Sequence, residues 1–87
     1  MTYEILIKAS AEKEIRRLSS EMCERITSAI LALRDEPRPS GVRKLKGRDE
    51  EGWRIRVGDY RVLYRIDDEL RQVTIYRVGH RRDVYRF

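Results

Sequence analysis

The spacing of hydrophobic residues changes twice along the chain. Residues 3–8 alternate between apolar and polar side chains, which predicts a short strand. Two stripes at helical spacing follow: Ala11, Ile15 and Leu18, and then Met22, Ile26, Ala29, Ile30 and Leu33. Ser10 can cap the first helix and the pair Ser19-Ser20 the second, which Pro37 ends. This half of the pattern predicts a helical hairpin.

After Gly41 the apolar residues alternate again. Leu45 falls in a short strand or loop, and three strands are predicted near 53–57, 60–67 and 72–78. Gly58-Asp59 forms a two-residue hairpin turn between the first two of these strands. A further short strand is expected over 83–86. Helices grouped before an antiparallel β-meander predict a two-layer α+β fold.

The turn at 58–59 fixes the register of the first hairpin. Val57 should lie opposite Tyr60, and Arg56 opposite Arg61. One face of the hairpin then belongs to the core under the helices: Trp53, Ile55, Val57, Tyr60, Val62, Tyr64 and Ile66. The other face carries mostly cations: Arg54, Arg56, Arg61 and Arg65, with Leu63 among them.

Arg56 directly opposite Arg61 is an unfavourable choice for stability, because like charges across a strand pair repel. A phosphate group would bind to both guanidinium groups, so the pair indicates a phosphate site. The alternative is a solvated face whose arginines pair with acids such as Glu4 or Asp83. If the phosphate site is correct, Arg61→Ala should leave stability unchanged or slightly raised.

The charge of the chain supports a polyanionic partner. The 87 residues include 20 basic and 15 acidic side chains, for a net charge of +5. Residues 38–87 hold fourteen of the basic side chains against eight acidic ones, and sixteen of the twenty are arginine. An arginine-rich basic half points to nucleic acid. The alternative is that the charge serves solubility alone.

Length and composition exclude several other classes. We expect one small domain over 1–87, which is too short for a dinucleotide-binding enzyme with a second domain. No apolar run reaches membrane-spanning length, and the N-terminus lacks the features of a secretion signal. Cys23 is the sole cysteine and fits a reducing cytoplasm. One histidine and one cysteine cannot form a zinc site, and we expect no metal and no small-molecule cofactor.

The C-terminal segment 78–87 adds further candidates. His80 is the only side chain with an unperturbed pKa near neutrality. Arg81 and Arg82 add charge, and Tyr85 offers a ring on which a base could stack. The structural alternatives are a satisfied histidine at a strand end and a tyrosine that packs in the core.

Three segments resemble the RelE/ParE superfamily of type II toxins, and the resemblance covers nearly the whole chain. They are Lys44-Leu45-Lys46-Gly47, the hairpin 53–64 and the run 78–85, and they are more similar to RelE than to ParE. The resemblance implies a RelE-like fold and a cytoplasmic toxin that a cognate antitoxin protein silences. It also implies cleavage of mRNA in the ribosomal A site by 2′-hydroxyl attack on the adjacent phosphate.

The resemblance also implies roles for individual residues. The catalytic set would be Arg54, Arg56, Arg61, Arg81 and Tyr85. If the reaction needs a proton acceptor, His80 is the candidate that this chain itself offers. Further RNA contacts would come from Lys44, Lys46, Arg65 and Arg82. The best-known RelE proteins have lysines in place of Arg54 and Arg56, and arginine cannot act as a base. Two alternatives therefore stay open: a ParE-like poison of DNA gyrase, and a non-catalytic protein that binds RNA or an antitoxin.

Overall fold

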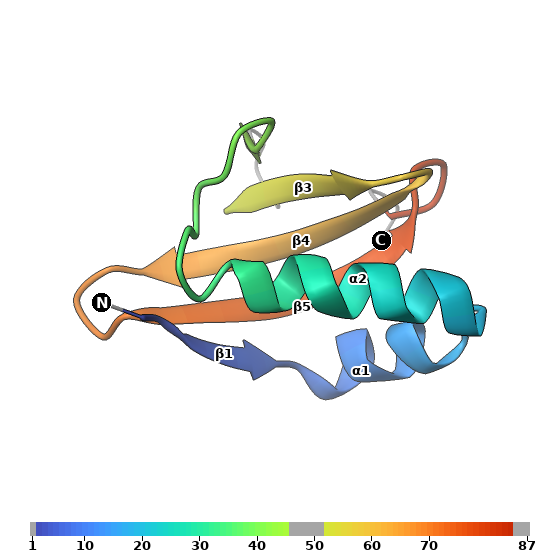
Figure 1. Cartoon of the computed structure of the whole chain (residues 1–87), viewed down its shortest axis with the longest axis horizontal. Helices are drawn as coiled ribbons and strands as arrows, with labels where there is room; N and C mark the ends of the chain where they lie inside the picture. The colour runs from blue at the N-terminus through green and yellow to red at the C-terminus, as the bar shows by residue number, and fades with distance from the viewer. Residues whose placement is uncertain (1, 46–51, 85–87) are drawn as a thin grey trace.

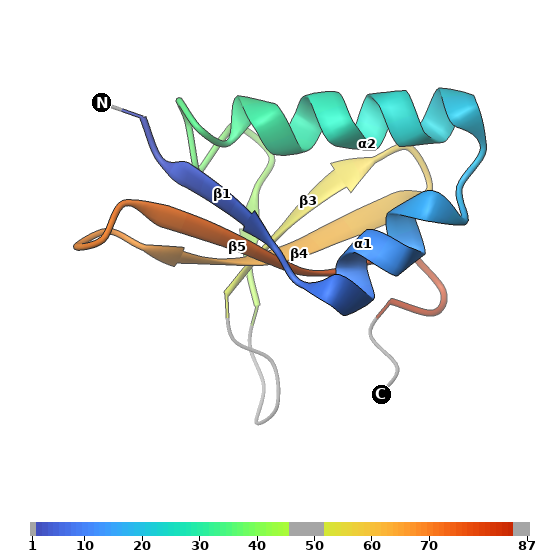
Figure 2. The same cartoon turned by 90° about the horizontal axis from the view of Figure 1, so that it is seen from below.

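A computed structural model describes residues 2–45 and 52–84, in which two helices lie on one face of a five-stranded sheet (Figures 1 and 2). The elements are β1 (Glu4–Ile7), α1 (Ala9–Arg16), α2 (Ser20–Ala32), β2 (Arg43–Lys44), β3 (Trp53–Val57), β4 (Tyr60–Asp67) and β5 (Gln72–His80). The predicted α+β class and element order are confirmed.

The strand order in the sheet is β1-β5-β4-β3-β2. The strands β3, β4 and β5 form the predicted antiparallel meander, and β1 pairs in parallel with β5 (Figure 1). The predicted register of the first hairpin, with Val57 opposite Tyr60 and Arg56 opposite Arg61, is confirmed and continues to Trp53 opposite Tyr64.

Two local predictions are wrong. Ser10 is the second residue of α1 rather than its cap, and the cap position belongs to Lys8, which has no side-chain cap bond. The predicted strand over 83–86 is not formed as far as the structure describes it, because Asp83 and Val84 belong to a turn and the rest of the segment lies outside the described residues. The second cap is confirmed, since the backbone N of Met22 donates to Ser19 Oγ over 3.2 Å.

The core lies between the helices and the sheet. Both predicted helix stripes and the predicted apolar face of the hairpin belong to it. Strand β5 adds three buried residues: Val73, Ile75 and Val78. The opposite face of the sheet is covered by neither helix (Figure 2).

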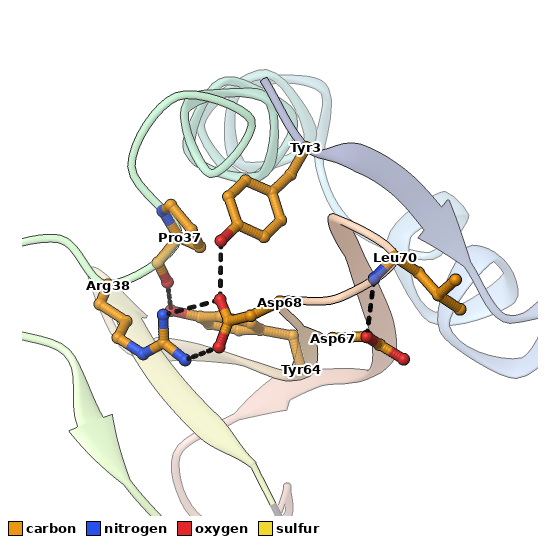
Figure 3. Close-up of polar contacts among 7 residues, drawn as sticks. All are labelled: Tyr3, Pro37, Arg38, Tyr64, Asp67, Asp68 and Leu70. Carbon is orange, nitrogen blue, oxygen red and sulfur yellow. Dashed lines mark hydrogen bonds and ion pairs between the residues drawn. The ribbon is translucent and has the colours of Figure 1, made fainter. Parts of the chain in front are cut away.

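A cluster of polar contacts connects the loop after α2 to strand β4 and to the turn that follows β4 (Figure 3). The buried Tyr64 hydroxyl donates to the carbonyl of Pro37 over 2.7 Å, and burial raises the pKa of this phenol. Arg38 NH2 lies 2.9 Å from Asp68 Oδ2, and the Tyr3 hydroxyl donates to Asp68 Oδ1 over 2.7 Å. The hydrogen bond from Arg38, followed by that from Tyr3, lowers the pKa of Asp68.

Within residues 2–45 and 52–84, neither helix is long and apolar enough to cross a membrane.

Candidate nucleic-acid interface

The sheet face away from the helices carries a concentration of arginines, which we call the arginine face. Strand alternation and the pairing register place these side chains on it: Arg43, Arg54, Arg56, Arg61, Leu63, Arg65 and Arg77. Arg43 pairs with Arg54, Arg54 with Leu63, and Leu63 with Arg77, so these four form one row across four strands. Arg56, Arg61 and Gly79 form the next row.

Arg61 is held by the backbone of its own hairpin turn. Its NH1 donates to the carbonyl of Gly58 over 3.0 Å and to that of Tyr60 over 2.9 Å. Only 8% of the Arg61 residue is exposed, whereas Arg56 opposite it is exposed. Among the described residues, no carboxylate forms an ion pair with either arginine. The two paired positions thus place two positive charges on neighbouring strands, without a carboxylate partner for either among the described residues.

These contacts change one expectation from the sequence. From the sequence alone, Arg61 contributes only repulsion to the free protein, so its removal should leave stability unchanged or slightly raised. The structure instead gives it two hydrogen bonds to backbone carbonyls in a nearly buried position. Loss of two hydrogen bonds from a nearly buried guanidinium is destabilising. Unchanged or slightly raised stability is expected instead when Arg56 is removed.

Arg54 is also nearly buried, with 7% of the residue exposed. It stands between Arg43 on β2 and Leu63 on β4, and Leu63 is fully buried although it faces away from the helices. The arginine face thus has a small apolar centre with cations around it. Arg54 is a preorganised part of this surface rather than a solvated side chain.

The turn after β5 folds onto the arginine face. A Cβ added to Gly79 would point to this face and come within 3.5 Å of the Val84 side chain, which is only 1% exposed. The backbone N of Arg81 donates to the carbonyl of Asp59 over 2.8 Å, and Arg81 Nε lies 3.9 Å from Asp59 Oδ1. These contacts tie Arg81 to the hairpin turn that carries Arg61.

The side chain of His80 does not lie on the arginine face. It pairs with Tyr60, whose side chain packs against the core, and the two rings meet edge to face at a centroid distance of 5.6 Å. Strand alternation therefore directs His80 toward the helix side of the sheet. Its Nδ1 accepts a hydrogen bond from the backbone N of Arg82 over 3.2 Å, which leaves the neutral ring's proton on Nε2. In this geometry His80 orders the C-terminal turn.

The remaining predicted RNA contacts are spread over the molecule. Lys44 Nζ lies 5.8 Å from the centroid of the Trp53 ring, on the helix side of the sheet edge. Arg65 is on the arginine face, and Arg82 is exposed in the C-terminal turn. Lys46 and Tyr85 lie outside the described residues, so their predicted roles stay predictions.

Two arginines of this face were missed from the sequence. Arg43 belongs to a two-residue strand, which is too short to show alternation. Arg77 follows an irregularity in β5 that shifts the register by one residue. The spacing of Ile75 and Val78, three residues apart and both apolar, was the available signal, since one regular strand cannot bury both on one face.

The arrangement favours anion binding and charge stabilisation. Guanidinium groups donate hydrogen bonds to phosphate in a fixed planar geometry and keep their charge at all physiological pH values. Residues 2–45 and 52–84 hold no cluster of three or more His, Cys, Asp or Glu side chains that could bind a metal ion. The chemistry of this surface is thus that of positioned cations.

Comparison with known proteins gives the same family by sequence and by structure. The sequence model described as the ParE toxin of the type II toxin-antitoxin system parDE matches residues 5–85. Toxin RelG of Mycobacterium tuberculosis is 39% identical over 90 residues, and the match covers 99% of each chain.

Two solved complexes contain a similar fold. The RelE–RelB complex of Pyrococcus horikoshii matches with a TM-score of 0.82 and 28% identity, over 97% of this chain and 100% of that chain. The toxin–antitoxin complex RelBE2 of Mycobacterium tuberculosis matches with a TM-score of 0.80 and 30% identity, over 92% of this chain and 99% of that chain. With the fold, the arginine face and these matches together, the chain belongs to the RelE/ParE superfamily of type II toxin–antitoxin toxins.

Proposed function

We propose that this toxin is a ribosome-dependent endoribonuclease that cuts mRNA in the A site. The observation that supports the proposal best is the pair Arg56 and Arg61, which lie directly opposite each other without a carboxylate partner among the described residues. Such a pair is unfavourable in the free protein and favourable once a phosphate lies between the two side chains.

The proposed reaction is a transesterification within the RNA. The 2′-oxygen attacks the adjacent phosphorus, the bond from phosphorus to the 5′-oxygen breaks, and a cyclic phosphate remains on the upstream fragment. Arg56 and Arg61 bind the phosphate, and Arg81 stabilises the charge that develops on it. The proton of the 2′-hydroxyl passes to water or to the ribosome, and the leaving 5′-oxygen takes one from water.

Among the described residues, the arginine face carries no histidine, which would explain why the ribosome is required. Arginine does not accept a proton at neutral pH, and His80 is directed to the other side of the sheet. Positioning of the 2′-oxygen in line with the leaving oxygen must then supply much of the rate enhancement. Ribosome-bound mRNA is held in place, whereas free RNA is not.

We also propose an antitoxin as the protein partner. The similar proteins of Pyrococcus horikoshii and Mycobacterium tuberculosis were solved as complexes with their antitoxins. An acidic segment that folds on the basic surface of this chain would be complementary to it in charge. Its affinity should fall as the salt concentration rises. A pull-down with the product of each adjacent reading frame tests the pairing, and the absence of any complex with a small neighbouring protein would contradict it.

A second candidate function is inhibition of DNA gyrase. It is favoured by one observation, the match of residues 5–85 to the ParE toxin family. Both functions would arrest growth, so toxicity alone does not separate them.

The experiment that separates them uses one mRNA in two forms. Primer extension is carried out on the free mRNA and on the same mRNA in a translation extract, each with the purified protein. The proposal predicts rapid cleavage in the extract only, and its loss when a 2′-deoxynucleotide replaces the nucleotide at the cut position. Equal cleavage of both forms would contradict the ribosome-dependent mechanism. Trapped gyrase–DNA complexes without mRNA cleavage would establish the second candidate.

A further inference from the structure

The irregularity in β5 gives the arginine face two neighbouring side chains instead of one. Leu63 pairs with Arg77, but the next residue of β4, Tyr64, pairs with Ile75. Ile75 and Val78 both belong to the buried core, although they are three residues apart. A β-bulge accounts for this, because it turns successive side chains to the same side of the sheet. Tyr76 and Arg77 consequently share the arginine face.

Tyr76 and Arg65 form a stacked pair on this face. The guanidinium carbon of Arg65 lies 4.6 Å from the centroid of the Tyr76 ring. Arg65 is exposed and Tyr76 is partly exposed, so the pair is accessible from solvent. Aromatic rings and guanidinium planes are the groups on which proteins stack the bases of single-stranded RNA.

The position of this pair relative to the phosphate site suits an RNA strand. Same-face residues of one strand are about 6–7 Å apart, so Arg65 lies two such steps from Arg61 along β4. A short stretch of extended RNA spans that separation. Arg77 lies between the two places, one step along β5 from Gly79, which pairs with Arg61.

We propose that Tyr76 and Arg65 form a second nucleotide subsite, in which one base of single-stranded RNA stacks on the pair while Arg77 adds positive charge beside its phosphate. The subsite rests on the proposed function, since its ligand is the RNA bound at Arg56 and Arg61. Stacking engages the face of a base rather than its edge, so the subsite accepts all four bases.

The test measures binding rather than cleavage. Fluorescence anisotropy at low ionic strength follows a short single-stranded RNA that binds the unaltered protein, Tyr76→Leu, Tyr76→Phe and Arg17→Gln. Arg17 is exposed at the end of α1, on the helix layer, and controls for binding that depends on total charge alone. A second set of RNAs carries one abasic nucleotide at successive positions. Thermal unfolding of each variant confirms that it is folded.

A base stacked on Tyr76 predicts how each variant should bind the RNA. Tyr76→Leu should bind the full RNA about tenfold more weakly, the scale for one stacked base, and Tyr76→Phe should bind it normally. For one of the abasic RNAs, the affinity of the unaltered protein should fall by the same factor. Tyr76→Leu should bind that RNA as tightly as the unaltered protein does. If the two losses multiply at every abasic position, Tyr76 does not contact a base and the subsite is wrong.

The remaining outcomes separate this inference from the proposed function. Normal mRNA cleavage with normal RNA binding by Tyr76→Leu would overturn the subsite and leave the nuclease function intact. RNA binding that depends on Tyr76 in a protein that cuts no mRNA would support the subsite and overturn the nuclease function. If Tyr76→Leu weakens antitoxin binding but not RNA binding, the pair is a protein contact and the proposal is wrong.

Discussion

Arg56 on β3 and Arg61 on β4 lie directly opposite each other on the face of the sheet that points away from α1 and α2. The two residues differ in how they are held. Arg61 is nearly buried and bonded to the carbonyls of Gly58 and Tyr60, while Arg56 is exposed and has no ion pair among the described residues. One arginine is thus fixed in advance and the other is free to close on a ligand.

This difference predicts opposite effects on stability. Arg61→Gln should lower the free energy of unfolding by about 1–2 kcal/mol, because two backbone carbonyls lose a charged donor. Arg56→Gln should leave it unchanged or raise it by a few tenths of a kcal/mol, because a repulsion is removed. Urea unfolding of the two variants measures both values. A loss of stability in Arg56→Gln similar to that in Arg61→Gln would show that Arg56 has a structural partner.

His80 should be dispensable for proton transfer. In His80→Asn a side-chain oxygen can still accept the hydrogen bond from the backbone N of Arg82, so the C-terminal turn should keep its shape. We expect a cleavage rate reduced by much less than the roughly 10²–10⁴-fold that general acid–base catalysis contributes. A rate loss within that range, in a variant that stays folded, would make His80 the proton acceptor.

The Tyr64 hydroxyl should contribute measurably to stability. Tyr64→Phe removes the buried hydrogen bond to the Pro37 carbonyl and leaves that acceptor without its donor (Figure 3). The expected cost is about 1–3 kcal/mol in the free energy of unfolding. The cleavage rate per folded molecule should not change, because this bond lies on the helix side of the sheet. Unchanged stability would mean that water replaces the hydroxyl.

Asp68 should make the stability depend on pH in the acid range. Its pKa is lowered in the folded state, mainly by the hydrogen bond from Arg38, so its contribution is present above the unfolded pKa of about 4 and is lost as the pH falls below it. Asp68→Asn should therefore flatten the loss of stability between about pH 5 and pH 2. The measurement is thermal unfolding across this range. If stability falls equally steeply with decreasing pH in both proteins, other carboxylates cause the pH dependence.

Most of the fold followed from local patterns in the sequence. The two-residue turn that begins at Gly58 determines the register of the whole first hairpin. The apolar residues at helical spacing belong to the core, as the pattern predicts. The failures have local causes. Ser10 has the right chemistry for a cap, but the helix begins one residue before it, at Ala9.

The candidate site was less predictable because it depends on contacts between distant segments. Alternation placed Arg61 on the correct face but could not show that the turn carbonyls hold its guanidinium. It also could not show that the bulge in β5 brings Arg77 to that face. His80 was chosen for its pKa alone, and its direction became visible only once its pairing with Tyr60 was known.

The most direct test of the arginine face as the active site is the rate of mRNA cleavage on ribosomes by three proteins. The unaltered chain, Arg61→Gln and Arg17→Gln are compared by primer extension over a time course, at equal concentrations of folded protein. Removal of one preorganised charge donor predicts that Arg61→Gln cuts about 10²–10³-fold more slowly, whereas Arg17→Gln, with the same change in charge on the helix layer, cuts normally. Cleavage by Arg61→Gln at the unaltered rate would contradict the assignment of this face as the active site.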